Sequence, residues 1–163
     1  MTKTSLDPTD LRILAILQQQ GRIPNLELAE LVGLSPTPCS RRVKQLEEAG
    51  VIRGYRAIVD PAALGLGITA MVGVRLEKHD PDALGAFLEA VRQHPSITEC
   101  LLMAGDVDYL LRVRMASVEA LKDFIIKDLT TIPAVSDTST MLILEASKPE
   151  SALPISAAIH GTS

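Results

Sequence analysis

The chain has 163 residues, of which 47% are hydrophobic and 22% charged, and its formal net charge is −4. This length suits one ordinary domain or two small ones, and the composition is typical of a soluble globular protein. No apolar run approaches a membrane span, and the N-terminus lacks an apolar signal segment, so we expect a cytoplasmic protein without a membrane partner.

The acidity belongs to the second part of the chain. Residues 1–60 carry eight basic and seven acidic side chains, a balance of +1, whereas residues 61–163 carry eight and thirteen, a balance of −5. A negative total therefore does not exclude nucleic-acid binding by the first part.

The first predicted helix follows a clear start signal. Asp7 fits the N-cap, Pro8 fits the first helical position, and Asp10 lies three residues after the cap. Gly21 is expected to end this helix. The apolar stripe that faces the core is then formed by Leu11, Ile13, Leu14 and Leu17.

A second helix and a tightly started third helix follow. Asn25 can cap the second helix, and Gly33 can take the left-handed turn at its end. Ser35 is then the N-cap of the third helix, with Pro36 and Pro38 at its first and third positions. The N–H groups of a first turn have no intrahelical partner, so these prolines cost no helical hydrogen bond and stiffen the helix start.

The third helix has an inward face and a basic face. At about 100° per residue, Cys39, Val43 and Leu46 share one narrow face. Thr37, Arg41 and Lys44 point the opposite way and Arg42 lies on a flank. A solvated basic face is the alternative interpretation. The preceding helix and short Gly-containing turn favour a helix-turn-helix, whose second helix enters the major groove of DNA.

The next segment, residues 51–60, is predicted to form a small wing or hairpin. Arg53 and Arg56 either contact phosphates there or are exposed linker arginines; the residues favour neither. Residues 61–66 lie in "DPAALGLG", a Pro/Gly-rich hinge at which we place the domain boundary.

From Ile68 the hydrophobic period changes to two, which indicates a sheet domain over residues 67–150. The pattern is strand, helix, strand, a turn, then strand, helix, strand, which is a ferredoxin-like split βαβ sheet with two helices on one face. Met71, Arg75, Arg112 and Arg114 are expected on the uncovered face, which a second copy would cover in a dimer. The expected strands are residues 68–78, 96–105, 109–116 and 135–148, and the helices lie in 80–95 and 117–133.

Two minor features complete the chain. The tail, residues 151–163, holds a short apolar patch, Ala152–Ile155, expected to add an edge strand. Cys39 and Cys100 lie in different predicted segments without metal-binding spacing, so we interpret them as free buried thiols.

These segments together resemble the Lrp/AsnC family of feast/famine transcription regulators. The resemblance rests on "LDPTDLRILAILQQQGR", "ELAELVGLSPTPCSRRVKQLEEAGVIRGY" and "AGDVDYLLRV". It covers nearly the whole chain, and its most specific part is the third-helix segment. It implies an α+β protein with an N-terminal winged helix-turn-helix and a C-terminal ferredoxin-like βαββαβ domain that senses an amino acid. Homodimers that assemble into tetramers or octamers are also implied.

We therefore predict a regulator that binds double-stranded DNA and responds to a small effector, with no cofactor and no catalytic or metal site. The family usually has a large apolar residue at the position of Ser40 and often an aromatic residue at the position of Val107. The first change is expected to alter packing or open a polar contact, and the second leaves the identity of the sensed ligand open. The predicted DNA-binding residues are Ser35, Thr37, Pro38, Ser40, Arg41, Arg42, Lys44 and Arg53. The predicted effector-binding residues are Gly105, Asp106, Val107, Asp108, Thr138, Ser139 and Thr140.

The chemistry proposed for the Gly105–Asp108 loop is that backbone N–H groups hold a carboxylate and an aspartate holds an ammonium. A plain β-turn, with exposed strand threonines nearby, is the alternative interpretation. Two other functions remain open: a ligand-independent architectural DNA-binding protein, and an enzyme like the sirohaem decarboxylases. The scattered His79, His94 and His160 give no metal spacing and argue against the enzyme.

Overall fold

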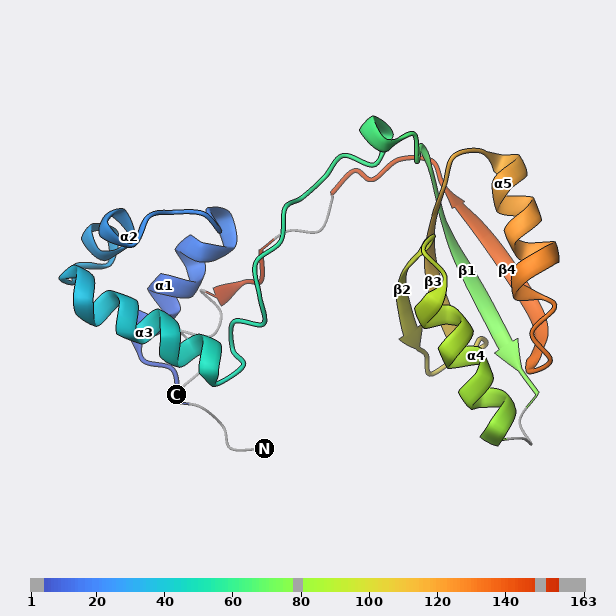
Figure 1. Ribbon diagram of the computed structural model, residues 1–163, viewed down its shortest axis with the longest axis horizontal. Helices are drawn as coiled ribbons and strands as arrows, with labels where there is room; N and C mark the ends of the chain where they lie inside the picture. Colours follow the sequence, from blue (N-terminus) through green and yellow to red (C-terminus); the bar gives the residue numbers. More distant parts are fainter. Residues whose placement is uncertain (1–4, 78–80, 149–151, 156–163) are drawn as a thin grey trace. The chain divides into compact units, whose positions relative to one another are not determined.

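The computed structural model describes residues 5–77, 81–148 and 152–155. The chain forms two compact units, Met1–Ile58 together with Lys148–Ser163, and Val59–Ser147. The first unit is helical and the second contains a four-stranded sheet (Figure 1). Across the described residues, no helix combines the length and the apolarity needed to cross a membrane.

Three helices form the first unit: α1 (Pro8–Gln19), α2 (Asn25–Val32) and α3 (Pro36–Glu48). The predicted start of α1 is confirmed, because Asp7 is its N-cap and forms a reciprocal capping box with Asp10. The helices pack around one small core. Its buried residues are Ile13, Leu28, Ala29, Val32, Cys39 and Leu46.

The segment after α3 differs from the prediction. Residues 53–60 form no strand, so the hairpin expected over residues 51–60 is wrong, and η1 (Ala62–Leu64) follows as a short 3-10 turn. An isolated two-stranded hairpin is at best marginally stable in water. Ile58 is 96% exposed, so it contributes no packing that would stabilise a hairpin in this segment.

The described part of the tail lies against α1. The Leu153 N–H donates to Gln18 Oε1 at 2.7 Å, and Gln18 Nε2 donates to the Leu153 carbonyl at 3.3 Å. The edge strand expected at Ala152–Ile155 is therefore wrong, because a glutamine amide takes the hydrogen bonds that a neighbouring strand would have taken. The remaining tail residues of that prediction lie outside the described residues.

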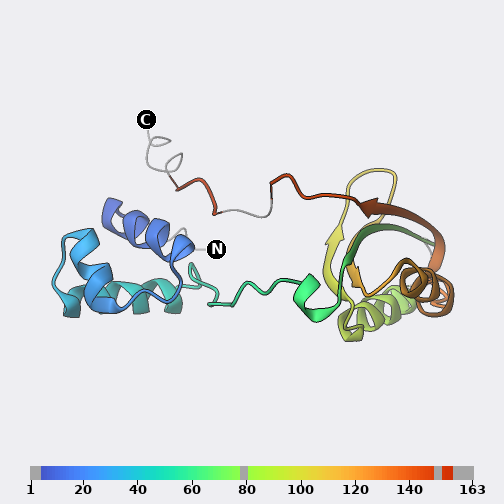
Figure 2. The ribbon, with the colours of Figure 1, turned by 90° about the horizontal axis from the view of Figure 1, so that it is seen from above.

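The second unit has the predicted ferredoxin-like topology. Its strand order is β2-β3-β1-β4, and each paired neighbour is antiparallel. Helices α4 and α5 cover one face of the sheet (Figures 1 and 2). The elements are β1 (Ile68–Leu76), α4 (Pro81–Gln93), β2 (Ile97–Leu102), β3 (Tyr109–Met115), α5 (Val118–Asp123), its π-helical continuation η2 (Phe124–Leu129) and β4 (Val135–Ile143).

Alternation along the strands separates two faces of this sheet. Residues 70, 72 and 74 of β1 and 111 and 113 of β3 point toward the helices and are fully buried. Phe87 of α4 joins them, with its ring 5.1 Å from that of Tyr109. The opposite face, which we call the open face, carries Thr69, Met71, Gly73, Arg75, Glu99, Leu101, Leu110, Arg112, Arg114, Asp137, Ser139, Met141 and Ile143.

One of the two cysteines departs from the prediction. Cys39 is buried in the helical core, as expected, but Cys100 is exposed. Its strand β2 lies at the edge of the sheet, and the neighbouring Leu101 and Leu102 are exposed as well. The expected buried position would have required a helix over this end of β2.

Candidate DNA-binding surface and effector loop

The start of α3 is held by backbone geometry and by α2. Gly33 takes a left-handed conformation, with φ 73°, and the Leu34 N–H donates back to the Ala29 carbonyl at 2.9 Å. Ser35 occupies the N-cap as predicted, although its side chain makes no cap hydrogen bond. The turn from α2 to α3 is therefore short and fixed by its backbone.

Asn25 has a different role from the predicted one. Pro24 is the N-cap of α2, and Asn25 is the first residue of the helix. Its Nδ2 donates to the Pro36 carbonyl at 2.9 Å. This bond ties the first turn of α2 to the first turn of α3, and so adds a side-chain restraint to the proline-stiffened helix start.

An exposed polar face of α3 lies opposite the buried Cys39 and Leu46. Lys44 Nζ lies 3.6 Å from Glu48 Oε1. This ion pair is exposed to solvent, and such pairs contribute little stability. Arg41 makes no ion pair with any other described residue. The face is a shallow depression lined by Asn25, Pro36, Thr37, Ser40, Arg41 and Lys44. Four predicted DNA-binding residues therefore come together here, with Ser35 and Pro38 in the adjoining first turn.

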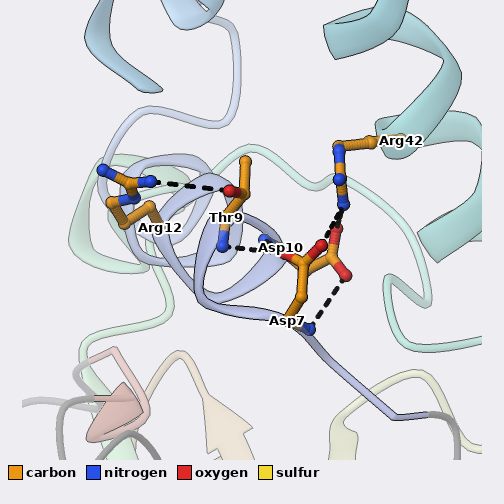
Figure 3. A network of polar contacts seen from close by, with 5 residues as sticks. All are labelled: Asp7, Thr9, Asp10, Arg12 and Arg42. Atoms are coloured by element: carbon orange, nitrogen blue, oxygen red, sulfur yellow. Dashed lines mark hydrogen bonds and ion pairs between the residues drawn. The ribbon is translucent and has the colours of Figure 1, made fainter. Parts of the chain in front are cut away.

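Arg42 does not belong to this face. Its Nη1 donates to Asp7 Oδ2 at 2.6 Å and to Asp10 Oδ1 at 2.8 Å, and both carboxylates come from α1 (Figure 3). Hydrogen bonds from Asp10 and then Asp7 raise the pKa of the Arg42 guanidinium above its usual value. The helical angle alone placed Arg42 on a flank, and its acidic partners are more than thirty residues away in the sequence.

Beyond α3, Arg53 is exposed and the chain folds back through Tyr55. The Tyr55 hydroxyl donates to Glu47 Oε1 at 2.9 Å. Partial burial and, secondarily, this carboxylate raise the pKa of Tyr55 to about 12. The hydrogen bond from the hydroxyl to Glu47 connects this segment to the C-terminal turn of α3.

The predicted effector loop, Gly105–Asp108, is fastened to strand β1. The Asp108 N–H donates to the Val74 carbonyl at 2.9 Å, and Asp108 Oδ2 accepts from the Leu76 N–H at 2.8 Å. The strand has a register shift between Arg75 and Leu76, and the Asp108 carboxylate satisfies the N–H at this irregularity. Asp108 is thus a structural anchor, while the Asp106 carboxylate has no partner among the described residues.

Arg75 connects this loop to β4 across the open face. Its Nε donates to the Asp106 carbonyl at 2.6 Å, and its Nη1 lies 3.7 Å from Asp137 Oδ2. Gly73 permits a close approach beside it. A Cβ at Gly73 would lie 2.6 Å from Ser139 Oγ and 2.9 Å from Val107 Cγ1. Sequence reasoning placed Arg75 on the uncovered face but assigned neither Arg75 nor Gly73 to the effector site, although a glycine inside a strand signals close approach of another segment.

The three predicted polar residues of β4 lie on two different faces of the sheet. Ser139 pairs with Gly73 and lies on the open face beside Val107. Thr138 and Thr140 pair with Val74 and Val72, whose side chains face the helices. Because side chains alternate along a strand, only Ser139 adjoins the loop on the open face, and an effector role for Thr138 and Thr140 stays a prediction.

Comparisons with known proteins agree with this architecture. A family described as winged helix-turn-helix DNA-binding matches residues 6–53, and one described as the Lrp/AsnC ligand binding domain matches residues 69–153. The leucine-responsive regulatory protein of Escherichia coli is 41% identical over 92% of this chain and 92% of its own. That of Haemophilus influenzae is 41% identical over 88% of this chain and 87% of its own.

Solved structures are similar over almost the entire chain. A transcriptional regulator from Neisseria meningitidis, solved as a complex with L-Met, has a TM-score of 0.91 at 38% identity and covers 94% of this chain and 99% of its own. An AsnC family regulator from Agrobacterium tumefaciens has a TM-score of 0.86 at 37% identity and covers 93% of this chain and 98% of its own. The chain belongs to the Lrp/AsnC family and is a DNA-binding transcriptional regulator.

Proposed function

We propose that α3 enters the major groove with its N-terminal half leading and that Thr37, Ser40, Arg41 and Lys44 contact DNA. The observation that carries this proposal is the exposed polar face on a helix whose first turn is restrained by Pro36 and by Asn25. Arg41 is suited to a guanine edge, because a guanidinium can bond two acceptors at once. Ser35 and Pro38, in the first turn, and the exposed Arg53 are proposed to contact the phosphate backbone.

We further propose that the effector is an amino acid bound at the Gly105–Asp108 loop beside Ser139, with no cofactor required. The N. meningitidis relative was solved with L-Met, and two curated relatives are named as leucine-responsive. The Asp106 carboxylate can accept the ligand ammonium, and the Gly105 backbone can approach its carboxylate. The regulatory names of the relatives support a cytoplasmic regulator rather than an enzyme.

A thermal-shift screen over the proteinogenic amino acids tests this proposal, because a ligand that binds only the native state raises the melting temperature. Asp106→Ala is expected to abolish the shift while stability without ligand changes by less than about 0.5 kcal/mol, since the residue is exposed. Asp108→Ala leaves the Leu76 N–H without its acceptor and is expected to cost about 1–3 kcal/mol of unfolding free energy. An unchanged shift in Asp106→Ala would place the ligand elsewhere.

We also propose that the open face of the sheet is the dimer interface, from which tetramers or octamers are built. The helices cover only the other face, and the open face exposes large apolar side chains such as Leu101 at 40% and Met141 at 54%. Apolar side chains gathered on one uncovered sheet face are typical of a protein–protein contact.

Met141→Glu is expected to shift the full chain toward monomer, because it introduces charge into the proposed apolar contact. Sedimentation velocity at micromolar protein measures the change. The control is Val118→Glu, which changes an exposed apolar residue of α5 on the helix-covered side and should leave the assembly intact. An undiminished dimer in Met141→Glu would rule out this face.

A further inference from the structure

The carboxylates of Asp7 and Asp10 take part in two contacts at once, the capping box of α1 and the ion pair with Arg42 of α3. Asp7 Oδ1 accepts from the backbone N–H groups of Thr9 and Asp10, each at 2.8 Å, and its other oxygen, Oδ2, accepts from Arg42. Asp10 Oδ2 accepts from the Asp7 N–H at 3.1 Å, and its Oδ1 accepts from Arg42. Each carboxylate therefore uses one oxygen for the capping box and the other for α3 (Figure 3).

Arg42 also balances the charge of the capping box. Its Nη1 bridges both carboxylates. The pair with Asp10 is partly shielded from solvent, because the Arg42 side chain is 32% exposed and that of Asp10 is 15% exposed. If Arg42 moved out to a DNA phosphate, two neighbouring carboxylates would lose their only described cation and would repel each other. Hydrogen bonding from the Asp10 N–H and, further, from Arg42 holds the pKa of Asp7 below its usual value, so the Asp7 carboxylate is ionised at neutral pH.

We infer that Arg42 is a positioning residue for DNA recognition, which locks the rotation of α3 against the capped N-terminus of α1, and that it does not contact DNA. Arg42 is adjacent to Arg41 on the helix, and neighbouring residues are separated by about 100° around the axis. Holding Arg42 on the α1 side therefore directs Arg41 toward the exposed face. This inference rests on the proposal that the exposed face of α3 reads DNA.

The two roles predict opposite signs for Asp10→Asn. If Arg42 were a phosphate ligand held back by acidic neighbours, removing a negative charge would release it and raise DNA affinity. If Arg42 positions α3, the same change weakens the lock and lowers affinity for the cognate duplex several-fold. Asp7→Asn is the companion variant, because asparagine caps a helix about as well as aspartate and so removes the charge while retaining the cap.

The experiment measures binding of the full chain to a duplex selected by wild type from a random library and to an unrelated duplex, over a range of salt concentrations. Loss of one phosphate contact lowers the salt dependence by about 0.9 in log K against log salt. Arg42→Gln is expected to lower cognate affinity more than unrelated affinity and to leave this slope unchanged. Arg12→Gln removes an exposed charge of the same unit outside the lock and is the matched control.

Circular dichroism confirms that each variant is folded at the temperature of the assay, so that altered binding is not unfolding. A higher affinity in Asp10→Asn, or a slope reduced by about 0.9 in Arg42→Gln, would overturn the inference and make Arg42 a DNA contact. Equal losses on both duplexes with an unchanged slope would also overturn it, because the role would then be in stability alone. Arg41→Ala binding like wild type would instead contradict the proposed reading face itself.

Discussion

Arg41→Ala is expected to lower affinity for the cognate duplex and to relax its sequence preference. An arginine that bonds a base edge through two donors is worth about 1–3 kcal/mol, or roughly 5- to 150-fold, against the wrong base. Arg41 has no ion pair within the described residues and projects away from the helical core, so its truncation should barely change the free energy of unfolding.

Lys44→Ala separates base reading from phosphate binding. If Lys44 contacts phosphate, its loss weakens binding to all sequences alike and reduces the salt dependence by about 0.9 in log K against log salt. Binding curves on cognate and unrelated duplexes measure both variants, with Arg12→Ala as a control for the loss of one positive charge. If both variants kept wild-type affinity and sequence preference, the proposal that α3 enters the major groove would be contradicted.

Local patterns predicted the helices and the four sheet strands, because these depend mainly on neighbours in the sequence, whereas the expected hairpin and tail strand did not form. The start of α1 needs only Asp7, Pro8 and Asp10, and these residues form it. The two-residue hydrophobic period at Ile68 predicted β1, and strand-like segments between the two helical stripes predicted the other three strands. Strand order and the antiparallel pairing then agree with the ferredoxin-like arrangement expected from the order of elements.

Side-chain contacts between distant residues were not predicted, and these determine which of the predicted site residues lie together. Nothing near Arg42 in the sequence indicates that Asp7 and Asp10 accept its hydrogen bonds. Ser139 and its two threonine neighbours point to opposite faces of the sheet, but which face each takes is known only from the register of β4 against β1. Asp108 was predicted to bind the effector, and its structural bond to the Leu76 N–H was not foreseen, since that bond depends on a register shift that no local pattern reveals.

The second large effect is expected at Gly73, where the effector loop meets the sheet. A methyl group there would lie 2.6 Å from Ser139 Oγ and 2.9 Å from Val107 Cγ1, closer than Cβ contacts in real proteins. The Ser139 hydroxyl can rotate away, whereas the β-branched Val107 side chain has few alternative rotamers. Gly73→Ala should therefore displace Val107, and with it the loop proposed to hold the ligand.

The expected result is loss of the effector response with DNA binding retained, because Gly73 lies in the sheet and α3 in the helical unit. Allosteric coupling is typically about 1–3 kcal/mol, so a ligand-dependent change of roughly 5- to 150-fold in DNA affinity should disappear. The matched control is Gly85→Ala in α4, where an added Cβ has no atom within 4 Å. Titration calorimetry with the amino acid found by the thermal-shift screen measures ligand affinity, and DNA titrations with and without it measure coupling. A Gly73→Ala protein that binds the ligand and responds as Gly85→Ala does would show that the ligand site lies away from Val107 and Ser139.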